Sequence, residues 1–71
     1  MMGTRGLTAV STPDLRTLLA AVHRGDVACP IDRIGLATAG LLRLGDDLEL
    51  LRGLDAAGVK AVLIGVLAER R

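Results

Sequence analysis

The stretch DAAGVKAVLIGVLAER, residues 55–70, decides the fold class of this 71-residue chain. Its large apolar residues recur at intervals of three and four, which places them along one face of an α-helix. Asp55 stands just before the apolar run and is the predicted N-cap, and Arg70 and Arg71 suit the C-terminal end of the helix dipole. We expect this repeat to be the most buried stripe of the protein: Val59, Val62, Leu63, Val66 and Leu67.

A second amphipathic helix is predicted over residues 12–24. Thr12 precedes Pro13, so we expect Thr12 to be the N-cap and Pro13 the first helical residue. Gly25 is expected to end the helix. The residues predicted to pack on the final helix repeat at helical spacing: Leu15, Leu18, Leu19 and Val22.

Two weaker segments lie between these helices. Pro30 is expected to open a helical segment over residues 30–44, either two short helices with a break near Thr38–Gly40 or one weak helix. We favour the break, because each interior glycine costs about 1 kcal/mol. The predicted inner face of this segment comprises Ile31, Ile34, Thr38 and Leu41. Further on, Asp46 and Glu49 resemble a capping box, which predicts a two-turn helix ending at Gly53. The leucines of this last segment expected to face inward are Leu48 and Leu51.

The fold class predicted from these segments is all-α, a compact bundle of four to six short helices. No stretch alternates with the period of two typical of strands. Residues 1–11 are assigned to a flexible leader, because residues 1–10 show no helical period and contain Gly3 and Gly6. Residues 12–71 then form one helical domain, which is all that this length accommodates.

Composition limits the function. The chain is 51% hydrophobic, has no aromatic residue and carries a net charge of +1, so it is neither disordered nor a polycation. Its one cysteine, Cys29, fits a reducing compartment. The longest uncharged runs, Ile34–Leu42 and Ala61–Ala68, fall short of the roughly 20 residues of a membrane span. The apolar run after Arg5 is too short for a signal peptide. We therefore expect a cytoplasmic protein without membrane contact.

Side chains able to do chemistry are few, and we expect neither an enzyme nor a cofactor or metal site. His23 and Cys29 are the one pair that could combine a base with a nucleophile, and no oxyanion-hole loop accompanies them. A structural zinc site needs four ligands, more than one histidine and one cysteine provide. The arginines are spread along the chain among eight acids, so nucleic-acid binding is not expected, although a small helix-turn-helix domain stays an alternative.

Charge of both signs points to protein–protein interaction. Three acids fall within four residues, at Asp46, Asp47 and Glu49. Opposite patches on one small body can join copies head to tail, which gives rings or filaments. The alternative is an ordinary mixed-sign surface in solvent. The arginines expected on the opposite side of such a contact are Arg24, Arg33 and Arg43.

Two families resemble parts of the chain. The segments LLRLGDDLELL (41–51) and GVKAVL (58–63) are similar to the C-terminal half of SAM domains. The layout from Pro13 to Arg71, with GLLRL (40–44), GLD (53–55) and VLAER (66–70), resembles bacterial death-fold adaptors, including CARD-like domains of antiviral defence operons. The second resemblance implies homotypic assembly through charged surfaces and recruitment of an effector such as a protease. SAM-like oligomerisation is the alternative, and neither family brings a catalytic residue.

Overall fold

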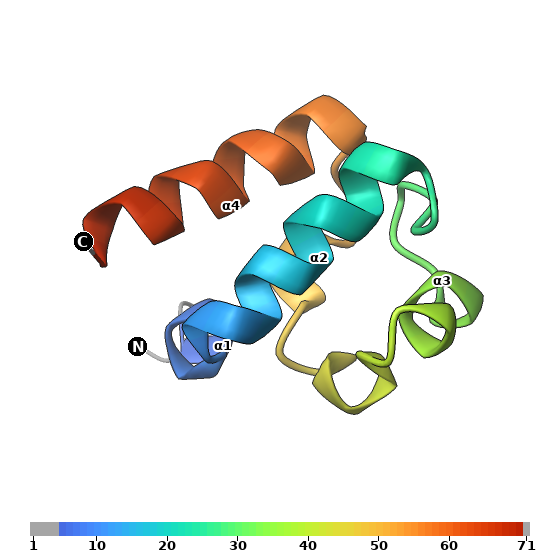
Figure 1. The fold of residues 1–71 in the computed structure, drawn as a ribbon, viewed down its shortest axis with the longest axis horizontal. Helices are drawn as coiled ribbons and strands as arrows, with labels where there is room; N and C mark the ends of the chain where they lie inside the picture. The colour runs from blue at the N-terminus through green and yellow to red at the C-terminus, as the bar shows by residue number, and fades with distance from the viewer. Residues whose placement is uncertain (1–4, 71) are drawn as a thin grey trace.

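Two long helices form the frame of the protein and pack against each other: α2 (Thr12–Arg24) and α4 (Ala56–Glu69). Figure 1 shows them side by side, with α3 on the other side of α2 from α4. The computed structural model describes residues 5–70, and no strand occurs within that range. The predicted all-α class is confirmed for the described part of the chain.

Helix α4 forms as its sequence predicts. Asp55 is the N-cap, and its Oδ1 accepts a hydrogen bond from the backbone N–H of Gly58 at 2.8 Å. Val59 and Leu63 are completely buried, whereas the other three residues of the predicted stripe are only half-buried and lie against the core. The predicted stripe therefore faces the core, but only two of its five residues are completely buried. Arg71 lies outside the described residues.

Helix α2 begins one residue earlier than the predicted cap allows. Ser11, not Thr12, is the N-cap: its backbone is extended, and its hydroxyl accepts from the backbone N–H of Asp14 at 3.3 Å. Thr12 is already helical, and Pro13 is tolerated because N–H groups in the first turn have no helical acceptor. The predicted end is confirmed, since Gly25 adopts the left-handed conformation at φ 87°.

The predicted leader contains a helix. Helix α1 (Arg5–Ala9) contacts the 3₁₀ turn η2 (Glu49–Leu51), and Leu7 and Val10 are almost completely buried. Residues 5–10 therefore belong to the packed body, which corrects the assignment of residues 1–11 to a flexible leader. The first four residues of that leader lie outside the described part of the chain.

The short helix α3 (Arg33–Thr38) does not begin at Pro30, as predicted. Residues 29–31 form a turn, and Asp32 is the N-cap, with its Oδ1 accepting from the backbone N–H of Gly35 at 2.7 Å. The predicted break is confirmed, because the helix ends at Ala39 and Gly40 takes a φ of 75°.

The inner face of α3 also differs from the prediction. Ile34 is 78% exposed, whereas Gly35 and Leu36 are buried. The cause is a close backbone approach, since a Cβ on Gly35 would lie 2.9 Å from the Cα of Val27. Gly35, which has no side chain, thus faces the body of the protein, and Ile34 next to it points outward.

The two-turn helix predicted from Asp46 to Gly53 is not formed: residues 49–51 form the 3₁₀ turn η2, and another 3₁₀ turn, η1 (Leu42–Leu44), precedes it. Leu48 occupies the N-cap position of η2, no side chain caps it, and the Asp46 capping box is therefore wrong. Leu48 and Leu51 are buried as predicted. Burial of these leucines, rather than a cap, holds the segment in place.

The core is built from aliphatic side chains alone, and no polar side chain of the described residues is buried. The Cα radius of gyration is 10.9 Å, close to the roughly 11 Å of a fully packed chain of this length. The buried side chains are those of Leu7, Val10, Leu15, Leu18, Ala21, Val22, Val27, Leu36, Leu41, Leu44, Leu48, Leu51, Val59 and Leu63.

Candidate functional site

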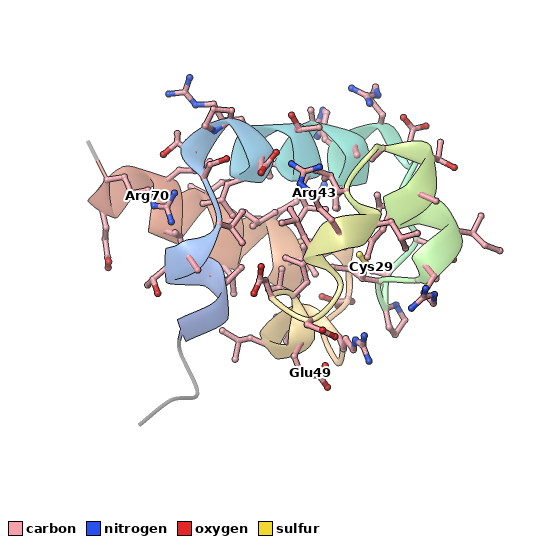
Figure 2. All side chains as sticks on the ribbon, turned by 90° about the horizontal axis from the view of Figure 1, so that it is seen from below. Cys29, Arg43, Glu49 and Arg70 are labelled. Atoms are coloured by element: carbon pink, nitrogen blue, oxygen red, sulfur yellow. The ribbon has the colours of Figure 1, made fainter. Side chains whose placement is uncertain are left out.

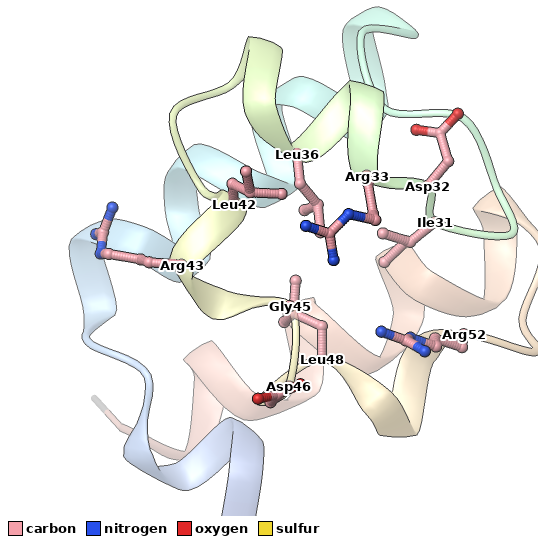
Figure 3. A pocket seen from close by; sticks show the side chains of 10 residues that line it. All are labelled: Ile31, Asp32, Arg33, Leu36, Leu42, Arg43, Gly45, Asp46, Leu48 and Arg52. Atoms are coloured by element: carbon pink, nitrogen blue, oxygen red, sulfur yellow. The ribbon is translucent and has the colours of Figure 1, made fainter.

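The structure brings three of the six predicted interface residues to one hollow. Arg33, Arg43 and Asp46 line a hollow of about 440 Å³ between α3 and residues 42–52. In Figure 3, Arg33 and Arg52 extend toward the middle of this hollow, whereas Arg43 points away from it. The predicted contact, with the acids of one copy against the arginines of another, stays a prediction.

Two of the predicted arginines already have acidic partners within the chain. Arg43 donates to Asp14 Oδ1 at 2.7 Å and to the carbonyl of Gly40 at 2.9 Å. Arg24 Nε lies 3.0 Å from Asp26 Oδ2. Surface pairs of this kind contribute little to stability. Both guanidinium groups therefore have an acidic partner within the chain.

The contact with Arg43 changes the ionisation of Asp14. The Arg43 guanidinium, and after it a hydrogen bond with the Ser11 side chain, hold the pKa of Asp14 below its ordinary value near 3.8. Because Asp14 is in the first turn of α2 and Arg43 in η1, this ion pair joins two elements 29 residues apart in sequence.

The three acids of the predicted interface lie beside an exposed leucine in the sequence. Asp46 and Glu49 are exposed, Asp47 is half-buried, and the side chain of Leu50 between them and Arg52 is 54% exposed. Glu49 makes an exposed pair with Arg52 at 3.5 Å. We call Asp46, Asp47, Glu49 and Leu50 the acidic turn. Figure 2 shows Glu49 at the edge of the molecule opposite α2.

Helix α4 is apolar on every side, yet it is buried on one side only. Its fourteen residues include only two charged ones, Lys60 and Glu69. Ile64 is 56% exposed, and it shares the outer side of the helix with exposed small residues at 57, 61, 65 and 68. Helices that are apolar all round are normally buried on all sides. The outer side of α4 thus departs from the ordinary burial of an apolar helix.

An open groove runs between this outer side of α4 and the neighbouring side of α2. The first part of the groove measures about 330 Å³. Its lining is apolar apart from Arg16, His23 and Lys60. The groove continues along Leu67 and Ala68. No acid lines either part. We call this feature the α2/α4 groove and define it by Arg16, Leu19, Ala20, His23, Lys60 and Ile64.

Sequence reasoning missed the groove because it treated the apolar repeat of α4 as a single inward face. The signal that could have found it is the composition of that helix. Ile64 falls outside the repeat that contains Leu63 and Leu67, and a solvent-facing helix would carry a polar residue there. Arg16 and Lys60 came from two different helices, so only the packing of α2 on α4 brings them to one rim.

His23 and Cys29, the one pair that could combine a base with a nucleophile, lie in different environments. His23 is exposed on the rim of the groove, whereas Cys29 is half-buried in the turn before α3. Burial, and after it the nearby carboxylates of Asp55 and Asp32, raise the pKa of the Cys29 thiol. A raised pKa disfavours the thiolate, which is the reactive form.

Within residues 5–70, no group of three or more His, Cys, Asp or Glu side chains could hold a metal ion. Among the helices of the same range, none has the length and apolar character needed to cross a membrane.

Comparison with known proteins gives no relative for this arrangement. No family model matches the chain, and neither a curated protein nor a solved structure shows significant similarity to it. The class that the structure defines is a small all-α domain with an open apolar groove between its two longest helices.

Proposed function

We propose that this chain is a protein–protein interaction domain that assembles with copies of itself or with similar helical domains. The observation that carries the proposal is the outer side of α4, where an apolar helix faces solvent beside the α2/α4 groove. Burying a side chain such as Ile64 contributes about 1.5–3 kcal/mol, so a partner that covers this face gains affinity from apolar contact.

The shape of the groove favours a protein as its occupant. It is open, it lies between α2 and α4, and its apolar lining continues from Leu19 to Ala68. Amphipathic helical segments recognise grooves of this kind through a few apolar anchors. Charges around such a groove set the register and choice of the partner more than its affinity.

The proposal includes the finer role that the death-fold resemblance implies. In that role the domain is a cytoplasmic adaptor that recruits an effector, such as a protease, in a bacterial defence system. SAM-like oligomerisation is the alternative within the same class. Both roles require self-association or association with a similar domain, so one measurement tests their common basis.

Sedimentation of the wild-type chain over a range of concentrations up to millimolar tests the proposal. We expect oligomers that grow with concentration, and we expect Ile64→Asp to weaken them at least tenfold. Ile34→Asp is the matched control, because Ile34 is also exposed but lies on α3, away from the groove. A chain that stays monomeric throughout, or that binds duplex DNA with a steep log-linear salt dependence, would contradict the proposal.

A further inference from the structure

Two surfaces of this one domain are complementary in charge. The α2/α4 groove is lined by apolar side chains together with Arg16, Lys60 and His23, and by no acid. The acidic turn has the opposite charge and an exposed apolar side chain, because Leu50 lies within five residues of all three acids and is 54% exposed. Opposite charges beside exposed apolar side chains are what a contact between two copies requires.

We infer that the acidic turn of one copy docks into the α2/α4 groove of the next, with Leu50 entering the apolar floor. The inference rests on the proposed function and names its two surfaces. Three acids and Leu50 lie within five consecutive residues, so one short segment brings both the apolar anchor and the charge. Arg16 and Lys60, from opposite walls of the groove, are placed to receive the carboxylates on either side of that anchor.

The positions of the two surfaces decide the type of assembly. The acidic turn lies at the edge of the molecule opposite α2, as the place of Glu49 in Figure 2 shows. A copy that inserts its turn into a neighbour still presents its own groove elsewhere. The contact is therefore heterologous, and repeated contacts form a ring or an open chain rather than a two-fold dimer.

The arginines expected from sequence are weaker candidates for this contact. Arg24 and Arg43 are paired with Asp26 and Asp14 within the chain, and no apolar groove lies beside them. Arg16 and Lys60 instead flank an apolar floor, which supplies the affinity that exposed charges alone lack. The groove thus combines positive charge with an apolar surface, and the predicted arginines do not offer this combination.

A charge-swap experiment tests the contact directly. The groove variant is Arg16→Glu with Lys60→Glu, and the turn variant is Asp46→Lys with Asp47→Lys. Alone, each variant places like charges on both surfaces, and we expect its self-association to fall at least tenfold. Mixed in equal amounts, the two variants again offer opposite charges at both contacts, and we expect assembly to return. Circular dichroism and thermal melting of each variant verify its fold.

The matched control is Arg24→Glu, which reverses the charge of an α2 arginine that does not line the α2/α4 groove. We expect it to associate like the wild type. Loss of assembly in this control, or failure of the mixed variants to associate, overturns the inference.

The remaining outcomes separate the inference from the proposed function. If Ile64→Asp abolishes self-association but the turn variant does not, the groove pairs with itself and only the inference is wrong. If the wild type does not associate at any concentration, the proposed function is wrong as well.

Discussion

Arg70, the residue that ends α4, donates a hydrogen bond to the backbone carbonyl of Leu7 in α1 at 2.9 Å. The same guanidinium donates to the Thr12 hydroxyl at 3.2 Å. The sequence predicts only a dipole contact for this arginine, whereas the structure makes it a link between the two ends of the chain. Arg70 thereby fixes α1 and the first turn of α2 against the last turn of α4.

Removal of this link is expected to destabilise α1 first. Arg70→Met keeps the aliphatic stem but loses the donors, and we expect a cost of about 1 kcal/mol in the free energy of unfolding. Amide exchange in residues 5–10 should rise more than exchange in α3. Arg70→Lys should recover only part of the loss, because an ammonium group lacks the planar fork of guanidinium. Unchanged exchange in α1 after Arg70→Met would contradict the link.

Two adjacent residues of α4 should differ sharply in their effect on stability. Leu63 is completely buried, and Leu63→Ala should cost about 2–5 kcal/mol by leaving a cavity. Ile64 is 56% exposed, and Ile64→Ala should change stability by no more than about 0.5 kcal/mol. Urea unfolding measures both. Equal losses for the two variants would mean that the outer side of α4 is covered even in a single copy.

The parts of the fold that were predictable from sequence are those with strong local signals. Asp55 predicts the start of α4, and the long apolar repeat that follows predicts its inner face. Gly25 after a helical repeat fixed the end of α2, because few residues other than glycine adopt its left-handed conformation at low cost. These signals act within one helix and depend on no distant contact.

The parts that were not predictable depend on packing between elements. The inner face of α3 is set by the close approach of Gly35 to Val27, which no periodicity within α3 records. Helix α1 is only five residues long, and its stability comes from burying Leu7 and Val10. The α2/α4 groove likewise exists only once two helices pack. Asp46 and Glu49 match a capping-box pattern, but no side chain caps η2 in the structure.

The true cap of α2 is open to a direct test. Ser11→Ala should cost about 1 kcal/mol, because the hydroxyl that accepts from the Asp14 N–H is lost. Thr12→Ala should also be destabilising, but through its bond with Arg70. A double-mutant cycle of Thr12→Ala and Arg70→Met should therefore show coupling, and a cycle of Ser11→Ala and Arg70→Met should not. Coupling only in the second cycle would mean that Ser11, and not Thr12, contacts Arg70.

Two helical glycines should respond in opposite directions to alanine. Gly65→Ala places a Cβ with nothing within 4 Å, and it should stabilise α4 by about 0.5–1 kcal/mol. Gly35→Ala places a Cβ 2.9 Å from the Cα of Val27, so the backbone must shift and stability should fall. Thermal melting separates the two. A stabilising Gly35→Ala would mean that α3 does not lie against Val27.

The pH dependence of stability should show the ion pair between Asp14 and Arg43. Because the pKa of Asp14 is lowered in the folded protein, its carboxylate stabilises the fold above the ordinary value near 3.8. This contribution is lost as the pH falls through the lower, folded pKa. Asp14→Asn should thus be less stable than the wild type at neutral pH, and the difference should disappear in acid.

A carboxyl titration by NMR assigns the cause of that dependence. Arg43→Met should raise the pKa of Asp14 toward 3.8, because the hydrogen bond from Arg43 is the largest cause of the lowered value. Ser11→Ala should raise it less, since the Ser11 hydrogen bond is the second cause. Arg24→Met is the control and should leave Asp14 unchanged, because Arg24 pairs with Asp26 instead. An Asp14 pKa that does not respond to Arg43→Met would mean that η1 is not held against α2 by this pair in solution.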